Sequence, residues 1–445
     1  MERLQALSLM PNAHKPITSL RWRIGGLLFA STVINYIDRQ TLSLLAPYLK
    51  VSYHWTNSDY ANLAIAFRVA YTLGQSVFGR LVDRAGTRRG LTFTVIGYSI
   101  VSMLTSLARG FYSFATFRFL LGAGESANWP GATKAVSEWF PKQERALATA
   151  LFDSGSSIGA AVAPFIVIRW IYPHWGWRPA VAVPSVLGFL WLIAWRWLYH
   201  TPEMHPRISE AEREMIVADK RESASPNATG SRPPWRDLLK LPQTWGTIIA
   251  KTFTDPVFFF IAEWLPIYLV AKGIELKSGL IGLWIPFIAA DIGSFFAGWL
   301  SGHLIRRGMS LGWARKVPVI YGGIGMTFLI FTIFTTNLYL IAALFSVVTF
   351  TYAGFTIIAN TLPSDLFESR SVATVSGFGG TGTGVGTIVA TKLIGYVSDA
   401  RQSAGTHSFD PIVIAAGIVP FIGMLLVLWL LRNNDATERG LVRRI

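Results

Sequence analysis

Twelve predominantly apolar stretches, each roughly the length of a membrane-spanning helix, follow one another through this chain of 445 residues. About 20 apolar residues in a helix are needed to cross the hydrocarbon core of a bilayer. The stretches predict membrane helices at 22–45, 58–79, 90–108, 111–133, 146–168, 178–199, 243–270, 279–301, 317–335, 338–360, 371–396 and 412–431. Stretches of this length are not those of an outer-membrane barrel, whose strands are segments of about 10 alternating residues.

The composition agrees with a membrane protein and argues against other classes. Only 15% of residues are charged, against about 25% in soluble proteins, so charges cannot coat several soluble domains. The chain has no cysteine, which excludes disulfides, thiolate metal sites and cysteine nucleophiles. The glycine-rich run at 379–386 lies inside an apolar stretch and is not followed by a lysine, so it is no phosphate loop. We therefore expect no enzyme, no metal and no cofactor.

The net charge is +15, with 40 basic against 25 acidic residues. A nucleic-acid partner would also suit this charge, but the basic residues lie in short segments between the apolar stretches, as in the cytoplasmic loops of membrane proteins. Most of them fall on the side that carries both chain ends. This distribution predicts that both termini are cytoplasmic, and we expect a lipid bilayer and no nucleic acid as partner.

The longest polar stretch divides the chain into two sets of six spans. We expect an N-terminal six-helix bundle over 1–200, a cytoplasmic linker over 201–241 and a C-terminal six-helix bundle over 242–445. Within the linker, residues 208–221 predict a short surface helix that Ser209 caps.

The two halves repeat one another. At a constant shift of 225 residues, the same residue types recur in five pairs, Arg145 and Arg370, Ala148 and Ala373, Thr149 and Thr374, Gly155 and Gly380, and Gly159 and Gly384. Two such repeats around a central substrate site are a transporter layout. The repeated glycines predict that the fifth and eleventh spans approach neighbouring helices closely.

Several motifs resemble the major facilitator superfamily. GRLVDRAGTRRG at 79–90 is similar to that superfamily's loop signature, and the segments at 35–47, 118–146 and 251–269 resemble its anion:cation symporter branch. Within that branch they are most similar to bacterial hexuronate (galacturonate/glucuronate) transporters, and also to D-galactonate transporters. The resemblance implies an all-α fold of twelve membrane helices, with two pseudo-symmetric six-helix bundles around a central cavity. It also implies a bacterial inner-membrane location.

Charged residues inside the predicted spans are the main candidates for function, because a charge in the bilayer costs at least about 2.5 kcal/mol. Arg39 and Arg118 would hold an anion, since the planar guanidinium binds carboxylate bidentately and stays charged. Asp38 and Glu125 would carry the coupling proton, because a water-poor site disfavours the ionised carboxyl. The alternative is that these four residues form buried ion pairs that only stabilise the first half.

The resemblance implies the same assignment, with Tyr36, Arg39, Tyr71, Arg118 and Glu125 on substrate and proton positions and Asp38 on a second proton position. For the second half we expect Asn360, Ser376 and Thr381 to bind sugar hydroxyls. Lys251 and Asp291 are expected to be structural. Arg68 and Glu263 are additional charges within the spans, with two alternatives left open: they pair with each other, or they contact the substrate.

The signature loop is expected to act as a contact between the halves that breaks and forms again during gating. Its residues are Gly79, Asp83, Arg84, Arg88 and Arg89.

We therefore expect a monomeric secondary transporter that moves an organic anion, a hexuronate or related sugar acid, together with protons by alternating access. The alternatives are the same fold with another anion, such as an aldonate, an aromatic carboxylate or phosphate, and a membrane sensor or enzyme without transport.

Overall fold

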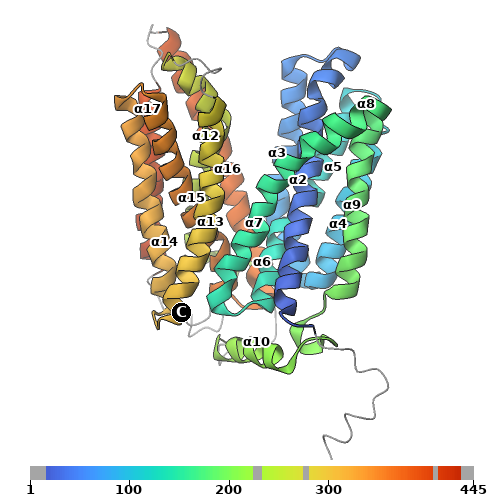
Figure 1. Ribbon diagram of the computed structural model, residues 1–445, viewed down its shortest axis with the longest axis vertical. Coiled ribbons are helices and arrows are strands. Elements are labelled where there is room, and N and C mark those ends of the chain that lie inside the picture. Colours follow the sequence, from blue (N-terminus) through green and yellow to red (C-terminus); the bar gives the residue numbers. More distant parts are fainter. Residues whose placement is uncertain (1–16, 224–232, 274–279, 404–408, 432–445) are drawn as a thin grey trace, which may run out of the picture.

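The computed structural model describes residues 17–223, 233–273, 280–403 and 409–431. These residues are almost entirely helical, and no β-strand occurs among them. Figure 1 shows two bundles of long helices side by side, the first half in blue to green and the second in yellow to red.

The first bundle contains the first six predicted spans. Its helices are α2 (Leu20–Tyr53), α3 (Asn57–Ala85), α4 (Thr87–Thr105), α5 (Phe111–Glu125) with α6 (Asn128–Trp139), α7 (Lys142–Pro164), and α9 (Trp177–Leu198). After Pro164, α7 continues as the π-helical η1 (Phe165–Ile171) and the short α8 (Tyr172–Trp175).

The second bundle contains the other six spans. Its helices are α12 (Pro242–Ala271), α13 (Leu280–Arg306), α14 (Leu311–Met326) with the 3-10 helix η3 (Thr327–Phe334), α15 (Leu338–Leu366), α16 (Ser369–Ser403) and α17 (Asp410–Leu430). All twelve predicted spans are thus confirmed as helical.

Two features differ from the sequence prediction. The fourth span is not one helix, because α5 ends at Glu125 and α6 begins at Asn128. Pro130, which has no backbone N–H to donate, lies in the first turn of α6, where that donor is not needed. The signature at 79–90 is not a loop either. Only Gly86 interrupts the helices there, and its φ of 78° is one that glycine adopts without strain.

The linker between the bundles carries η2 (Pro202–Met204), α10 (Glu210–Ser223) and α11 (Trp235–Leu239). At the start of α10 the backbone N–H of Glu212 donates to Ser209 Oγ at 3.3 Å, so Ser209 caps this helix as expected. Helix α10 lies across one end of the molecule, which we call the α10 end (Figure 1).

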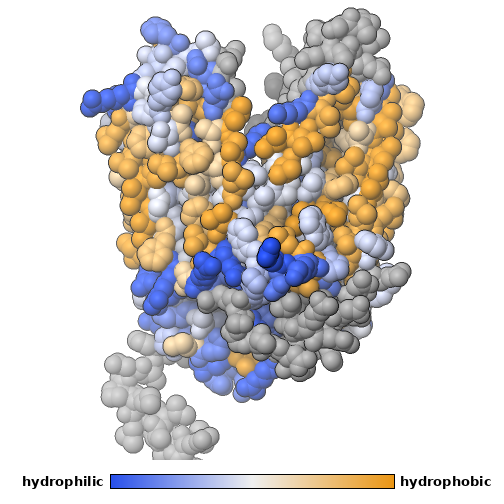
Figure 2. All heavy atoms as spheres, turned by 180° about the vertical axis from the view of Figure 1, so that it is seen from behind, coloured by the Kyte–Doolittle hydropathy of each residue, from blue (hydrophilic) through white to orange (hydrophobic). Residues whose placement is uncertain are grey.

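Apolar side chains cover the outside of both bundles between their ends. Figure 2 shows this surface as an orange band with hydrophilic residues above and below it. Exposed members include Phe93, Ile193, Trp197, Ile288 and Phe331. Six of the described helices are long and apolar enough to cross a membrane by length and composition alone.

The halves meet along two diagonal helix pairs, α7 with α13 and α3 with α16. Glycines bring the backbones together at both. A Cβ on Gly79 would lie 2.3 Å from Ala373 O, and one on Gly302 would lie 2.4 Å from Gln143 O. The predicted close approaches are confirmed too, since a Cβ on Gly159 would lie 2.5 Å from Val33 O and one on Gly384 2.2 Å from Thr72 Oγ1.

A buried ion network joins the halves at the α10 end. The fully buried Arg145 of α7 reaches Asp365 of α15 at 3.1 Å and Asp219 of α10 at 3.0 Å. Asp365 also pairs with Arg315 of α14 at 2.7 Å, and Arg315 donates to Lys142 O at 2.8 Å. At the opposite end the molecule is hollowed between the bundles (Figure 2). The structure is therefore closed at the α10 end and open at the other.

Candidate functional site

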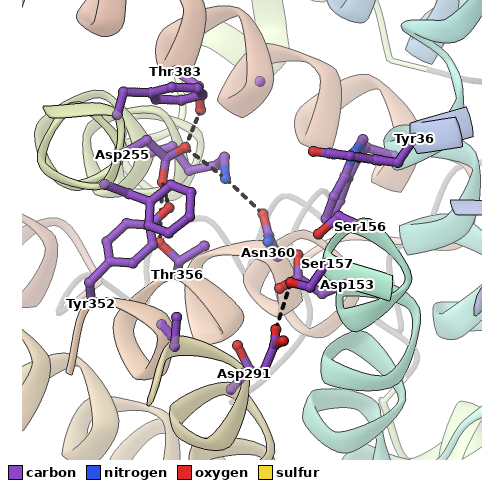
Figure 3. A pocket seen from close by; sticks show the side chains of 18 of the residues that line it. Tyr36, Asp153, Ser156, Ser157, Asp255, Asp291, Tyr352, Thr356, Asn360 and Thr383 are labelled. Atoms are coloured by element: carbon purple, nitrogen blue, oxygen red, sulfur yellow. Dashed lines mark hydrogen bonds and ion pairs between the residues drawn. The ribbon is translucent and has the colours of Figure 1, made fainter. Parts of the chain in front are cut away.

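A cavity lies between the two bundles, and both supply its walls. The polar lining residues of the first half come from α2, α3 and α7, and those of the second half from α12, α13, α15 and α16 (Figure 3). They are Tyr36, Arg39, Tyr71, Gln75, Asp153, Ser156 and Ser157 on one side, and Lys251, Asp255, Asp291, Ser294, Tyr352, Thr356, Asn360, Ser376 and Thr383 on the other.

Arg39 is held among aromatic rings at the first-half wall. Its guanidinium carbon lies 4.6 Å from the ring centre of Tyr71, 4.8 Å from that of Tyr36 and 5.0 Å from that of Phe67. Such cation–π contacts orient a guanidinium and leave its N–H groups available for other partners. One of those partners is Glu125, whose Oε2 lies 3.2 Å from Arg39 Nη2.

Behind this wall lie three residues that the sequence predicts to face the cavity or its neighbourhood. Glu125 is fully buried, and no described group donates to its Oε1. Arg118 is buried, and its guanidinium carbon lies 4.7 Å from the ring centre of Phe67. Arg118 does not line the cavity. Asp38 is also buried, and both of its carboxylate oxygens lack a hydrogen-bond partner among the described residues.

The second-half wall contains a hydrogen-bonded cluster around Asp255. Lys251 Nζ lies 3.0 Å from Asp255 Oδ2 and donates to Asn360 Oδ1 at 2.9 Å. Asp255 also accepts from Tyr352 and Thr356, at 3.1 and 3.2 Å, and from Thr383 at 2.5 Å. The bond from Thr383 to Asp255 is drawn in Figure 3. The cluster fixes Lys251 and Asn360 at the cavity surface.

A third group of polar residues lies where α7 meets α13. Ser157 Oγ donates to Asp291 Oδ1 at 2.9 Å, which links the two halves at the level of the cavity. Asp153 lies one turn earlier on the same face of α7 and also lines the cavity (Figure 3). Within the described part of the chain, Asp153 forms no hydrogen bond or ion pair.

The sequence predictions for the second half are met unevenly. Asn360 and Ser376 line the cavity, and Ser376 Oγ donates to Thr133 of the first half at 3.3 Å. Thr381 does not line it, because its hydroxyl donates to Thr72 O at 2.8 Å and lies 2.7 Å from Ser76 Oγ. Lys251 and Asp291, expected to be structural, both line the cavity instead.

The expected gating residues divide into two groups. Asp83 is buried between the halves, where it pairs with Lys134 at 2.9 Å and accepts from the backbone N–H of Thr374 at 2.7 Å. Gly79 forms the close contact with α16 described above. Arg88 instead donates to Arg196 O within its own half, and Arg84 and Arg89 are exposed.

The polar lining residues that sequence reasoning missed are Gln75, Asp153, Ser156, Ser157, Asp255, Ser294, Tyr352, Thr356 and Thr383. Asp153 and Asp255 carry a usable signal, because each is a carboxylate inside a predicted span. The hydroxyl residues carry none, since they are common in membrane helices. Of the two additional charges, the Arg68 guanidinium lies 6.0 Å from the ring centre of Phe259, and the side chain of Glu263 lies outside the described residues.

Comparison with known proteins agrees with this architecture. The sequence profile of the Major Facilitator Superfamily matches residues 28–391. The hexuronate transporter of Escherichia coli (strain K12) is 30% identical over 427 residues, which cover 95% of this chain and 97% of that protein. The probable galactarate/D-glucarate transporter GudP of Bacillus subtilis (strain 168) is 29% identical, with 92% and 91% covered.

A similar fold is found among solved structures. The proton:xylose symporter XylE, bound to 6-bromo-6-deoxy-D-glucose, superposes with a TM-score of 0.70 at 14% sequence identity, over 92% of this chain and 95% of that one. At this identity the likeness concerns the fold. Together with the matched profile and the two bundles around a cavity, it leads to one conclusion: the chain is a membrane transporter, not an enzyme, and belongs to the major facilitator superfamily.

Proposed function

We propose that this chain is a proton-coupled symporter of an organic anion, and that the anion is a hexuronate or a related sugar acid. The observation that carries the proposal is the Arg39 guanidinium at the cavity wall, held by aromatic rings and 3.2 Å from the buried Glu125 carboxylate. The names of the similar transporters support the substrate class, since they are named for sugar acids.

In this proposal Arg39 binds the substrate carboxylate, and the rings of Tyr36 and Tyr71 hold the guanidinium in place. Asn360 and Ser376 bind hydroxyl groups from the opposite wall. Arg118 acts on the bound anion through its charge from behind Phe67. Thr381 takes part through the contact between the halves, and its hydroxyl reaches substrate only when that contact opens.

Proton coupling follows from competition for one cation. A substrate carboxylate that binds Arg39 displaces Glu125 from its only ion-pair partner in the described part of the chain. A buried, ionised carboxylate without a partner is unfavourable in free energy. Glu125 then takes up a proton, so that proton and substrate each favour binding of the other. Asp38, buried without a hydrogen-bond partner among the described residues, serves as the second proton carrier.

Alternating access proceeds by rocking of the units 1–200 and 242–445, with 201–241 as the linker. The basic residues favour the α10 end as the cytoplasmic one, so the described state is open to the outside. We propose that the protein works as a monomer in a bacterial inner membrane, with both termini cytoplasmic. Release inside requires that Asp83 and Arg145 part from α16 and α15.

The test is uptake into proteoliposomes containing the purified full-length protein. Labelled galacturonate should accumulate when an inward proton gradient is imposed, and a protonophore should abolish the accumulation. Unlabelled aldonates, aromatic carboxylates and phosphate serve as competitors. Accumulation that ignores the proton gradient would contradict the coupling, and stronger competition by phosphate or an aromatic carboxylate would contradict the substrate class.

A further inference from the structure

The charges that line the cavity are unequal in number and in pairing. Two cations, Arg39 and Lys251, face three carboxylates, Asp153, Asp255 and Asp291. Each cation already has an acidic partner, Glu125 for Arg39 at 3.2 Å and Asp255 for Lys251 at 3.0 Å. The remaining two carboxylates, Asp153 and Asp291, form no salt bridge among the described residues, and Lys251 acts on Asp153 only through its charge while Asp255 already pairs with it.

These two carboxylates lie together where α7 meets α13. Ser157, one turn after Asp153 on α7, donates to Asp291 Oδ1 at 2.9 Å, and Figure 3 shows all three residues at one corner of the cavity. Behind the first-half wall, Arg118 adds one buried cation and Asp38 one buried carboxyl, but neither lines the cavity. Among the residues that the structure describes, the corner therefore carries two acidic groups and no basic one, in contrast to the wall that holds Arg39.

Building on the proposed function, we infer that Asp153 and Asp291 restrict the transporter to sugar acids with one carboxylate and exclude the corresponding diacids. A monoacid places its carboxylate on Arg39 and turns its hydroxyl groups toward the acidic corner, where carboxylates accept hydrogen bonds. A diacid of the same length brings a second negative charge to the same corner.

Lys251 does not relieve that second charge. Its ammonium group is neutralised by Asp255 and donates to Asn360. Asp255 in turn accepts from Tyr352, Thr356 and Thr383, so the pair is held in position. Two of the three N–H groups of Lys251 are taken by Asp255 and Asn360, and a carboxylate that bound the third would share a cation whose charge Asp255 already neutralises. The second half therefore presents Lys251 as a hydrogen-bond donor without net positive charge.

The expected effect is large enough to measure. Like charges a few ångströms apart near a protein surface repel by more than the roughly 1.4 kcal/mol that corresponds to a tenfold change in affinity. We therefore expect a diacid to compete at least about tenfold more weakly than the matched monoacid. Neutralising Asp153 should remove most of that ratio.

The experiment uses the full-length protein in proteoliposomes, with labelled galactonate exchange as the readout. Galactonate and galactarate are compared as competitors, because they share chain length and hydroxyl configuration and differ in one terminal carboxylate. In the wild type galactarate should compete at least about tenfold more weakly than galactonate. In Asp153→Asn the two should become similar, whereas Asp153→Glu, which keeps the charge, should resemble the wild type.

Asp291→Asn is the second variant, and its amide oxygen can still accept from Ser157. Exchange of galactonate by each variant shows that it is folded, and binding of both competitors by thermal shift replaces exchange if a variant does not turn over. Equal competition in the wild type, or an unchanged ratio in both Asn variants, would overturn the inference and leave the proposed function standing. Absence of exchange with every sugar acid would refute the proposed function itself.

Discussion

The buried carboxylate of Asp365 is the best place to test how the closed end is held. It pairs with Arg145 of the other half at 3.1 Å and with Arg315 of its own half at 2.7 Å, and all three side chains are almost fully buried. Asp365→Asn keeps the shape of the side chain and removes the charge that both arginines face. We expect the variant to favour the state in which the α10 end is open.

The size of the shift follows from the pairing. Removing one partner of a buried ion pair costs about 3–5 kcal/mol, and asparagine still accepts one hydrogen bond, so we take about 3 kcal/mol. Of the two ion pairs of Asp365, only the one with Arg145 joins the halves. About half of the free-energy cost therefore applies only to the state in which the α10 end is closed. A difference of about 1.5 kcal/mol shifts the equilibrium roughly tenfold toward opening.

Cysteine labelling measures this opening directly, because the chain contains no cysteine of its own. Ala373, fully buried between the halves with Val82 and Ala127, becomes accessible only when the α10 end opens. In Ala373→Cys, adding Asp365→Asn should raise the rate of labelling by a water-soluble maleimide about tenfold. Asp237→Asn, which alters an exposed pair in α11, is the matched control. Equal labelling rates with and without Asp365→Asn would refute the reasoning.

Three further predictions concern the site and the linker. Arg39→Lys should weaken substrate binding, measured by calorimetry, at least about tenfold, because an ammonium group cannot replace the planar guanidinium. Arg118→Lys should weaken binding less, since Arg118 does not line the cavity. Equal losses of affinity in the two variants would contradict this order. Glu125→Gln should keep substrate exchange and lose accumulation driven by a proton gradient, and normal accumulation by that variant would remove Glu125 from the coupling. His205, outside the spans, has its pKa lowered from 6.5, chiefly by burial. Because the pKa is lower in the folded state, the contribution of His205 to stability is present above pH 6.5 and is lost as the pH falls. The melting temperature should therefore drop between pH 7.5 and 5.5 in the wild type, and drop less in His205→Gln. Equal drops in the two proteins would contradict this account.

The helices could be predicted from the sequence because apolar length alone specifies them in a bilayer. The break between Glu125 and Asn128 was not predicted, since the apolar pattern continues across it. Gly86 illustrates the same limit, because a one-residue turn between two helices looks like a polar loop when read as sequence. The pattern of apolar residues locates the middle of a membrane span, but it is less informative about the residue at which a helix ends and the backbone turns.

Site residues could be predicted where a charged side chain lies inside a membrane span. They were harder to predict where contacts with neighbouring side chains decide whether a residue reaches the cavity. Arg39 reaches the cavity as expected, but Arg118 is kept from it by the Phe67 ring, which no pattern in the sequence reports. Thr381 and Ser376 are both small hydroxyl residues of α16 five positions apart, and only the packing against α3 separates the one that lines the cavity from the one that does not. Lys251 and Asp291 show the converse, since both were expected to be structural.

The glycine contacts between the bundles have a practical consequence. At Gly79 and Gly302 a single methyl group would meet a carbonyl oxygen of the other half at 2.3 and 2.4 Å, so alanine at either position acts as a molecular wedge. Such a substitution changes no charge and touches no ligand, yet it penalises one conformation of the working cycle. It offers a means of trapping the form that is open at the α10 end for structure determination, without a bound inhibitor or a conformation-specific antibody.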